Sequence, residues 1–177
     1  RAGRPLVVPA TLIRVVRTLL ADHASDPALI ALALMPPDPA YIAALESTID
    51  ADGIAQARDF LFVSLARELR ADFERVYGER RVRASYAPTP AQIGARKLAN
   101  TCLRYLGCLD DAAAHALVVG QYDAADNMTD TVGALTAIKD SASAARFDLF
   151  ARFEAKWRDE PLVLDKWFTL EAMSTRK

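Results

Sequence analysis

The stretch DGIAQARDFLFVSLARELRADFERVYG, from Asp52 to Gly78, decides the fold class of this sequence. Its apolar residues recur at steps of three and four, which is the period of one face of an α-helix. Charged residues fall between them and form a second, polar face. The pattern predicts one long amphipathic helix, Ile54 to Tyr77, which Gly78 ends as a C-terminal glycine. The apolar face consists of Ile54, Ala57, Leu61, Leu65, Leu69, Phe73 and Val76.

Prolines divide the rest of the chain into further helices. Asp26-Pro27, Asp38-Pro39 and Thr89-Pro90 each place a capping residue before a proline at the first helical position, and Pro161 opens the last apolar segment. Together with the segments between them, these signals predict about nine helices, and no run shows the alternation of a strand. Antiparallel helix pairs joined by such short turns suit either a bundle or an irregular α-solenoid. No repeat of fixed period is visible, so a solenoid would be of the degenerate armadillo or HEAT type.

Composition excludes several classes of partner. The 177 residues include 22 Lys and Arg against 23 Asp and Glu, a net charge of −1, which gives no attraction to nucleic acid or to an anionic membrane. No segment reaches the ~20 consecutive apolar residues of a membrane span. We expect no nucleic-acid partner and no membrane partner. Residues 1–177 lack an internal boundary and an initiator Met, so we expect one all-helical segment that begins partway through a gene product.

The residues that could carry chemistry form no motif. His23 and His115 lie in neither H-E-x-x-H nor E-x-x-H, and Cys102 and Cys108 lack the spacing of a zinc site. On one helix the two cysteines would lie ~9 Å apart along the axis, too far for a disulfide, so we expect two reduced thiols. No phosphate-binding or dinucleotide-binding loop is present. The sequence predicts no catalytic, cofactor-binding or metal-binding residue in this chain.

Aromatic side chains gather towards the end of the chain. Trp167 and Phe168 belong to the segment DKWF, Asp165 to Phe168, which suits either a buried ion pair beside an indole or a surface that docks a partner. Periodicity alone leaves both possibilities open. Before them, four aromatic residues recur at helical steps and are expected to form a packing stripe: Phe147, Phe150, Phe153 and Trp157.

Three blocks in a fixed order carry a resemblance. They are NTCLRYL at 100–106, QYDAADNMTDTVGAL at 121–135 and PLVLDKWFTLEA at 161–172. Together they closely resemble the C-terminal helical domain of the bacterial aminopeptidase N family, the zinc-dependent alanyl aminopeptidases of the gluzincin clan. The segment DPALIALALMPPD and the helix expected at 54–77 also resemble that domain, so the resemblance spans nearly the whole chain.

The resemblance implies a fold and a context. The fold is an all-α, irregular armadillo/HEAT-like superhelix of antiparallel helix pairs, which packs on the catalytic domain of the same polypeptide and encloses the active-site cavity. The family removes N-terminal residues from peptides with one Zn²⁺, held by H-E-x-x-H and a glutamate, and recognises the substrate amine through G-x-M-E-N. None of these motifs occurs here, so the resemblance places Zn²⁺ in the parent enzyme and none in this chain. It also implies a cytoplasmic protein whose contact with peptide substrates is indirect.

Asn127-Met128-Thr129 has the pattern of a glycosylation acceptor and also of a helix start. In a cytoplasmic protein the acceptor would meet no glycosyltransferase, so the resemblance favours Asn127 or Thr129 as a helix cap, with Asp130 in the first turn.

Three functions remain as hypotheses. The first is a non-catalytic segment of a zinc aminopeptidase that limits substrate access to the cavity. The second is a free-standing helical-repeat adaptor that uses the aromatics of residues 147–168 as its binding surface. The third, a small helical enzyme, is disfavoured because no catalytic constellation is present.

Overall fold

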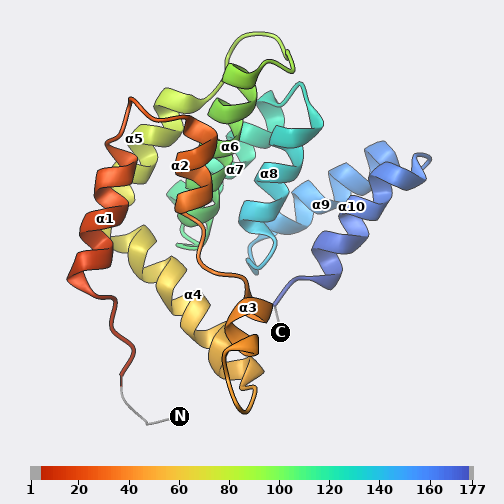
Figure 1. The fold of residues 1–177 in the computed structure, drawn as a ribbon. Helices are drawn as coiled ribbons and strands as arrows, with labels where there is room; N and C mark the ends of the chain where they lie inside the picture. The colour runs from red at the N-terminus through yellow and green to blue at the C-terminus, as the bar shows by residue number, and fades with distance from the viewer. Residues whose placement is uncertain (1–4, 176–177) are drawn as a thin grey trace.

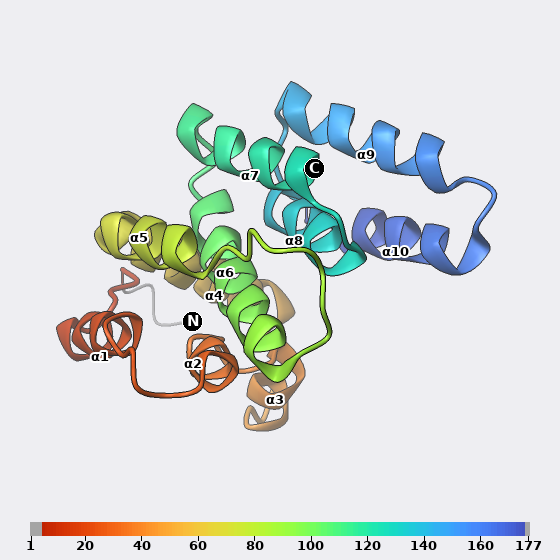
Figure 2. The same cartoon turned by 90° about the horizontal axis from the view of Figure 1, so that it is seen from above.

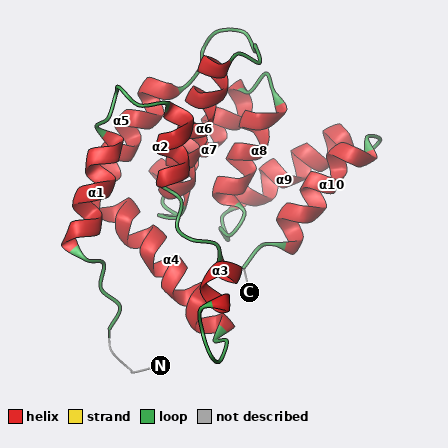
Figure 3. Cartoon of the chain, in the orientation of Figure 1, coloured by secondary structure: helices red, strands yellow, loops and turns green. Residues whose placement is uncertain are grey.

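The computed structural model describes residues 5–175, and within this range it contains α-helices and no strand (Figures 1 and 3). The predicted all-α class is therefore confirmed. None of the described helices has the length and hydropathy needed to cross a membrane. The helices are α1 Ala10–Leu20, α2 Pro27–Ala33, α3 Pro39–Ala44, α4 Ala51–Glu68, α5 Arg70–Arg80, α6 Pro90–Gly107, α7 Ala112–Ala124, α8 Met128–Ile138, α9 Ala144–Trp157 and α10 Pro161–Ala172.

The helices pack in successive pairs that form two layers. Helices α5 and α6, α7 and α8, and α9 and α10 are neighbours in sequence and in contact. Seen from above, α7 and α9 lie along one side, while α6, α8 and α10 follow one another along the other (Figure 2). Helix α2 packs on α6 and extends that second layer. This is the stacked arrangement of an irregular helical superhelix.

The proline-marked helix starts are confirmed. Asp26 accepts a hydrogen bond from the backbone N–H of Ala28 at 2.7 Å, and Asp38 accepts one from Ala40 at 2.8 Å. Thr89 accepts from the N–H of Gln92 at 3.3 Å. Each cap precedes a proline at the first helical position, where the missing N–H costs nothing.

The single long helix expected at 54–77 is wrong, because the chain breaks at Leu69 into α4 and α5. Leu69 has φ −116° and ψ 23°, outside helical geometry, and its side chain is buried. An unbroken helix of that length would extend ~36 Å, beyond the ~27 Å of its 18-residue partner α6. The break lets α5 lie against α6 while α4 turns towards α3 (Figure 1). It also accounts for ten described helices in place of nine.

Gly78 does not end a helix, which corrects the second expectation for this stretch. It lies inside α5, which continues to Arg80, and the chain then becomes extended at Arg81. A Cβ at Gly78 would meet nothing within 4 Å, so neither packing nor backbone conformation requires glycine there.

Tyr105 on α6 lies at the centre of the core. Its ring stacks on Phe73 of α5 with centroids 4.5 Å apart and is tilted against Phe62 of α4 at 4.8 Å. Its hydroxyl donates to the carbonyl oxygen of Leu34, just after α2, at 2.5 Å. One side chain therefore joins four helices, and burial raises the pKa of its hydroxyl.

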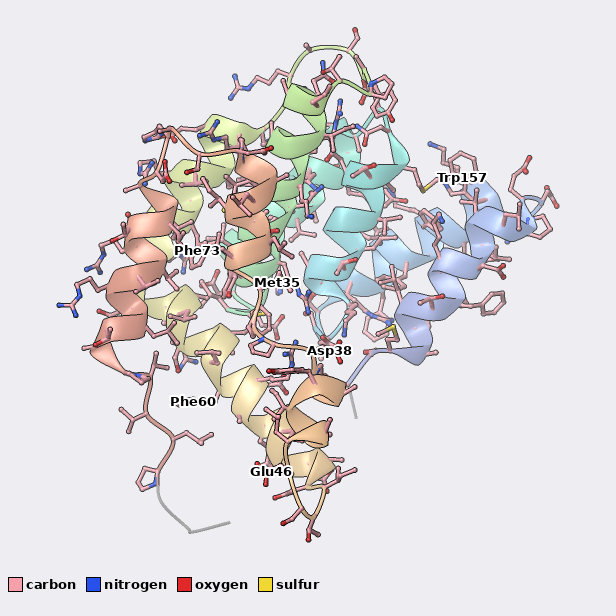
Figure 4. All side chains as sticks on the ribbon, in the orientation of Figure 1. Met35, Asp38, Glu46, Phe60, Phe73 and Trp157 are labelled. Carbon is pink, nitrogen blue, oxygen red and sulfur yellow. The ribbon has the colours of Figure 1, made fainter. Side chains whose placement is uncertain are left out.

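The aromatic stripe of α9 is only partly a packing stripe. Phe150 and Phe153 are buried as expected, but Phe147 is 50% exposed, which corrects its assignment to the core. Trp157, labelled in Figure 4, is half-buried, and its ring centroid lies 6.4 Å from that of Phe153. The N–H of Trp167 donates to the carbonyl oxygen of Phe150 at 3.1 Å, so Trp167 does fasten α10 to α9.

The segment DKWF contains no buried ion pair. Asp165, Lys166 and Phe168 are all exposed on α10, and only Trp167 is half-buried. The possibility of an ion pair beside the indole is therefore wrong, because α10 lies at the edge of the structure and buries a single narrow side.

Candidate functional site

A buried polar network lies where α6 meets α8. Arg96 of α6 is only 3% exposed, and its Nε lies 3.5 Å from Oδ2 of Asp130 on α8. The other guanidinium nitrogens reach the amide oxygen of Gln92 and the carbonyl oxygen of Ala87. The ring of Tyr86 covers the guanidinium, 4.6 Å from its carbon to the centroid. Arg96 therefore holds the 81–89 loop onto both helices.

The carboxylate of Asp130 also accepts hydrogen bonds from the side-chain amides of neighbouring residues. Asn100 Nδ2 donates to Asp130 Oδ1 at 3.1 Å, and Asn127 Nδ2 donates to Oδ2 at 2.9 Å. Gln121 of α7 donates to the side-chain oxygen of Asn100 at 2.6 Å and to the backbone oxygen of Asp130 at 2.9 Å. A Cβ at Gly133 would overlap the Asn100 amide, so glycine is what allows α8 to approach the network.

Asn127 is the cap of α8, which settles the choice between Asn127 and Thr129. Its side-chain oxygen accepts from the N–H of Asp130 at 2.9 Å. Thr129 lies one position inside the helix and faces a surface groove instead. The block NMTD therefore combines a helix cap with the carboxylate of the buried network.

The surface beside this network is hollowed in two places. A groove of about 430 Å³ lies between α6 and α8, and a second hollow of about 530 Å³ lies between α8 and α10. Thr129 and Val132 line both, so the two hollows adjoin along the layer formed by α6, α8 and α10. Met35, labelled in Figure 4 just after α2, lines the groove as well. Lys97 and Arg104 line it from α6.

A serine, a histidine and an aspartate also meet, near the turn between α8 and α9. His115 Nε2 lies 2.8 Å from Oδ1 of Asp110 and 3.4 Å from Oγ of Ser141. In a catalytic triad, one ring nitrogen faces the nucleophile and the other faces the carboxylate. Here both partners face the same nitrogen, so the cluster lacks the geometry of a triad. Asp110 has φ 51° in the turn that follows α6, and this turn places its carboxylate beside His115.

No group of three or more His, Cys, Asp or Glu side chains suited to a metal ion occurs within residues 5–175. His115 is held by Asp110 and Ser141, and His23 lies in a different part of the fold, between α1 and α2. The described residues therefore do not fit the ligand set of a catalytic zinc, which takes three protein ligands and an open position.

The two cysteines are free thiols. Cys102 is buried inside α6, and burial raises the pKa of its thiol to about 12. Cys108 follows the end of α6, and burial raises the pKa of its thiol to about 11. Both remain protonated at neutral pH and act as small apolar side chains, as expected from the sequence.

Comparison with known families identifies the architecture. A family described as "Domain of unknown function (DUF3458_C) ARM repeats" matches residues 2–177. The chain belongs to this family. Its ARM-repeat description agrees with the stacked helix pairs, so the armadillo-like superhelix expected from the resemblance is confirmed.

Relatives of this ARM-repeat chain carry one recurrent description. This chain is 36% identical over 170 residues to a curated "Aminopeptidase N" of Haemophilus influenzae, and 36% identical over 172 residues to one of Escherichia coli. These matches cover 96% and 97% of this chain but only 19% and 20% of the relatives, so the chain spans about one fifth of their length. The resemblance to the helical part of aminopeptidase N is confirmed.

A solved structure shares the fold. The crystal structure of Legionella pneumophila aminopeptidase A in complex with aspartic acid aligns with a TM-score of 0.81 at 20% identity. The alignment covers 98% of this chain and 21% of that protein. At this identity the likeness concerns the arrangement of the helices alone.

Sequence reasoning missed the buried network and the groove. Arginine is mostly a surface residue, so nothing marked Arg96 as buried, and a carboxylate beside a helix cap is explained by the cap alone. The available signal was the spacing of Arg96 and Asn100, four residues apart on one face of a helix, together with the polar block at Asn127–Asp130.

Proposed function

We propose that this chain is a non-catalytic part of the C-terminal helical domain of an aminopeptidase N-type enzyme, and that it forms one wall of the cavity in which peptides are held. The observation that carries the proposal is the match to two proteins described as aminopeptidase N, along nearly the whole of this chain and about one fifth of theirs. The remaining length of such a protein supplies the catalytic part. The reaction is removal of N-terminal residues from peptides in the cytoplasm.

The zinc ion of such an enzyme would activate water for attack on the peptide bond. In the proposal its ligands come from the catalytic domain of the same polypeptide, since the described residues of this chain offer no fitting donor set. The layer of α6, α8 and α10 carries the adjoining hollows and is the face we assign to the cavity. Thr129 and Val132 lie at the middle of that face.

The proposal is tested in the full-length enzyme by narrowing this face with Thr129→Trp. We expect turnover of a single-residue chromogenic amide to change little, because such a substrate ends near the metal. Turnover of a ten-residue peptide should fall, because the longer chain must lie against the wall. A matched Thr18→Trp, on the exposed side of α1, should affect neither substrate. Equal effects of Thr129→Trp on both substrates would contradict the assignment of this face.

The chain itself should show no peptidase activity. Incubated with Zn²⁺ and an alanine-linked chromogenic amide, the 177-residue protein should release nothing above background. Turnover that a chelator abolishes, in a preparation free of other peptidases, would make the chain an enzyme in its own right and overturn the proposal.

The second candidate function is a helical-repeat adaptor that binds another protein. It is favoured by two aromatic side chains that face solvent, Phe147 at 50% and Phe168 at 56% exposure. The gene decides between the two functions. H-E-x-x-H and G-x-M-E-N encoded in the same reading frame would support the enzyme, and their absence would support the adaptor.

A further inference from the structure

Two cations of the α6–α8 groove have no carboxylate partner within residues 5–175. Lys97 is exposed and Arg104 is half-buried, and neither makes a hydrogen bond or ion pair from its charged group. Other arginines at helix contacts do have partners: Arg70 binds Asp111 at 2.6 Å, and Arg152 binds Asp123 at 2.6 Å. The groove therefore presents two uncompensated positive charges.

Arg104 is held in position although no carboxylate of residues 5–175 pairs with it. Its guanidinium carbon lies 4.9 Å from the centroid of the Phe62 ring, which is buried in the core. The guanidinium of Arg58 lies over the same ring at 6.0 Å, and its Nη1 donates to the carbonyl oxygen of Pro37. Two like charges at one ring repel each other, and a partly desolvated guanidinium without an anion is unfavourable. An anion placed beside Arg104 would relieve both costs.

The rest of the groove offers hydroxyl groups and apolar surface. Thr101 and Thr129 line it from the two helices, and Ile93, Met35 and Val132 supply the apolar part. No carboxylate of the described residues lines the groove, and the carboxylate of Asp130 beside it is engaged by Arg96 and Asn100.

Carboxylates do lie on the other side of Arg104, in a neighbouring hollow. Asp140 there is bound by Lys139 at 2.6 Å, and Asp110 by His115 at 2.8 Å. Asp59 lines the same hollow without lying within ion-pair distance of Arg104. The charge of Arg104 is therefore available on the groove side.

The spacing of the two cations fits an extended chain. Lys97 and Arg104 are seven residues apart on one helix, so they share a face about 10 Å apart along its axis. Three residues of a peptide in the extended polyproline II conformation cover ~9 Å and bring the side chain back to the same face. Two carboxylates separated by three residues would therefore reach one cation each.

We propose that the α6–α8 groove binds acidic peptides in extended form, with one carboxylate at Lys97 and a second at Arg104. This inference rests on the proposed function in taking the ligand to be a peptide, but the site itself follows from the uncompensated charges. The carboxylates come from acidic side chains or from the C-terminus of the peptide, which share one chemistry.

The test measures binding and needs no turnover. A fluorescently labelled peptide with two glutamates three residues apart, amidated at its C-terminus, is titrated with the full chain, and its counterpart with two glutamines is titrated in parallel. We expect the glutamate peptide to bind about tenfold more tightly or better, with the difference reduced at high salt. A third peptide with one glutamate and a free C-terminal carboxylate three residues later distinguishes the two sources of the second charge.

Matched variants assign the effect to the groove. Lys97→Gln/Arg104→Gln should remove the preference for the glutamate peptide. Arg14→Gln/Arg67→Gln, which removes two exposed charges from α1 and α4, should leave it within about twofold. If Arg104→Gln disturbs folding, seen as a lower melting temperature, Lys97→Gln/Arg104→Lys keeps the charge over Phe62 and should retain part of the preference.

Equal binding of glutamate and glutamine peptides, or equal loss in the groove variant and its control, would overturn the inference. Binding that follows the groove charges in a chain that proves to be no part of an aminopeptidase would sustain the site and remove only the proposed function.

Discussion

Asn127 shows how much one side chain contributes at the residue scale. Its oxygen caps α8, and its amide nitrogen donates to Asp126 at 2.8 Å and to Asp130 at 2.9 Å. We expect Asn127→Ala to lower the free energy of unfolding by about 1–2 kcal/mol, the scale of a lost cap. Thr129→Ala, which removes a groove hydroxyl and no cap, should cost less than about 0.5 kcal/mol. Urea unfolding measures both, and equal costs would show that Asn127 is not the cap.

The two thiols, Cys102 buried and Cys108 half-buried, make stability depend on pH. Burial raises the pKa of Cys102 to about 12 and of Cys108 to about 11, above the ~8.5 of a thiol in an unfolded chain. The unfolded state therefore loses its thiol protons first as the pH rises. The resulting stability is fully present below about pH 8.5 and is lost as the pH rises towards the folded pKa values.

Between about pH 9 and 10.5 we expect the unfolding free energy to fall by up to about 1.4 kcal/mol per pH unit for each thiol. Cys102→Ala/Cys108→Ala should make this fall shallower, and the buried hydroxyl of Tyr105, whose pKa burial also raises, should account for part of what remains. Urea unfolding at several pH values measures the slope. A slope unchanged in the double variant would mean that the thiols are ionised in the folded protein.

What could be predicted at the residue scale was local. A cap at Asp26, Asp38 or Thr89 depends on neighbours two or three residues away, which the sequence contains. Of the partners of Arg96, Gln92 lies one turn earlier on α6, but Ala87 lies in the preceding loop and Asp130 on α8, which only folding brings together. The spacing of Arg96 and Asn100 on one helix face was a local signal, but it could not identify Asp130 as their shared partner, nor Arg104 as a cation with no carboxylate partner among residues 5–175.

At the scale of elements, the contact between α6 and α8 depends on Gly107. A Cβ built there would overlap the backbone carbonyl of Ala137, which cannot move without shifting α8. We expect Gly107→Ala to destabilise the protein by about 3 kcal/mol or more, in the range of severe overpacking. The control is Gly120→Ala in α7, where a Cβ meets nothing within 4 Å. It should stabilise by about 0.5–1 kcal/mol through helix propensity. Thermal unfolding measures both, and a neutral Gly107→Ala would mean that the helices are not in contact there.

The break between α4 and α5 marks the limit of periodicity as a guide to elements. The apolar stripe of residues 54–76 continues through Leu69 without interruption, and no glycine or proline marks the change of direction. The break exists because α5 follows α6, while α4 must also reach α3. That requirement is tertiary, so a pattern that measures only one helix at a time overlooks it.

At the scale of the whole molecule, the stacked pairs make stability uneven. Each pair contacts mainly its neighbours, so the ends of the stack are held from one side only. Helix α6 supplies the largest share of the buried residues, whereas α10 buries Leu170 alone and projects at one edge (Figures 1 and 2). The sequence predicted the all-α class because helical periodicity reveals that each helix has a buried face. It did not predict how many neighbouring helices cover that face, because periodicity describes one helix at a time.

A polar clasp formed by Arg146 and Lys139 joins Trp167 in holding α10 to the rest. Arg146 of α9 is buried and binds Glu171 near the end of α10, and it also donates to the carbonyl oxygen of Lys139 at 3.2 Å. The ammonium group of Lys139 donates to the carbonyl oxygen of Met173 at 3.0 Å. Because the apolar contact of α10 is small, this clasp should set how often the helix detaches.

Hydrogen exchange read helix by helix tests this uneven stability. We expect amides of α6 to exchange only through global unfolding and those of α10 to exchange through a cheaper local opening. Glu171→Gln leaves the buried guanidinium of Arg146 without its anion and should lower the opening free energy of α10 by about 1–3 kcal/mol while leaving α6 nearly unchanged. The control is Asp148→Asn, which breaks an exposed ion pair with Arg152 at 3.2 Å and should change α10 by less than about 1 kcal/mol. If α10 were as protected as α6, and Glu171→Gln lowered both together, the stack would unfold as one cooperative unit and the clasp would have no separate role.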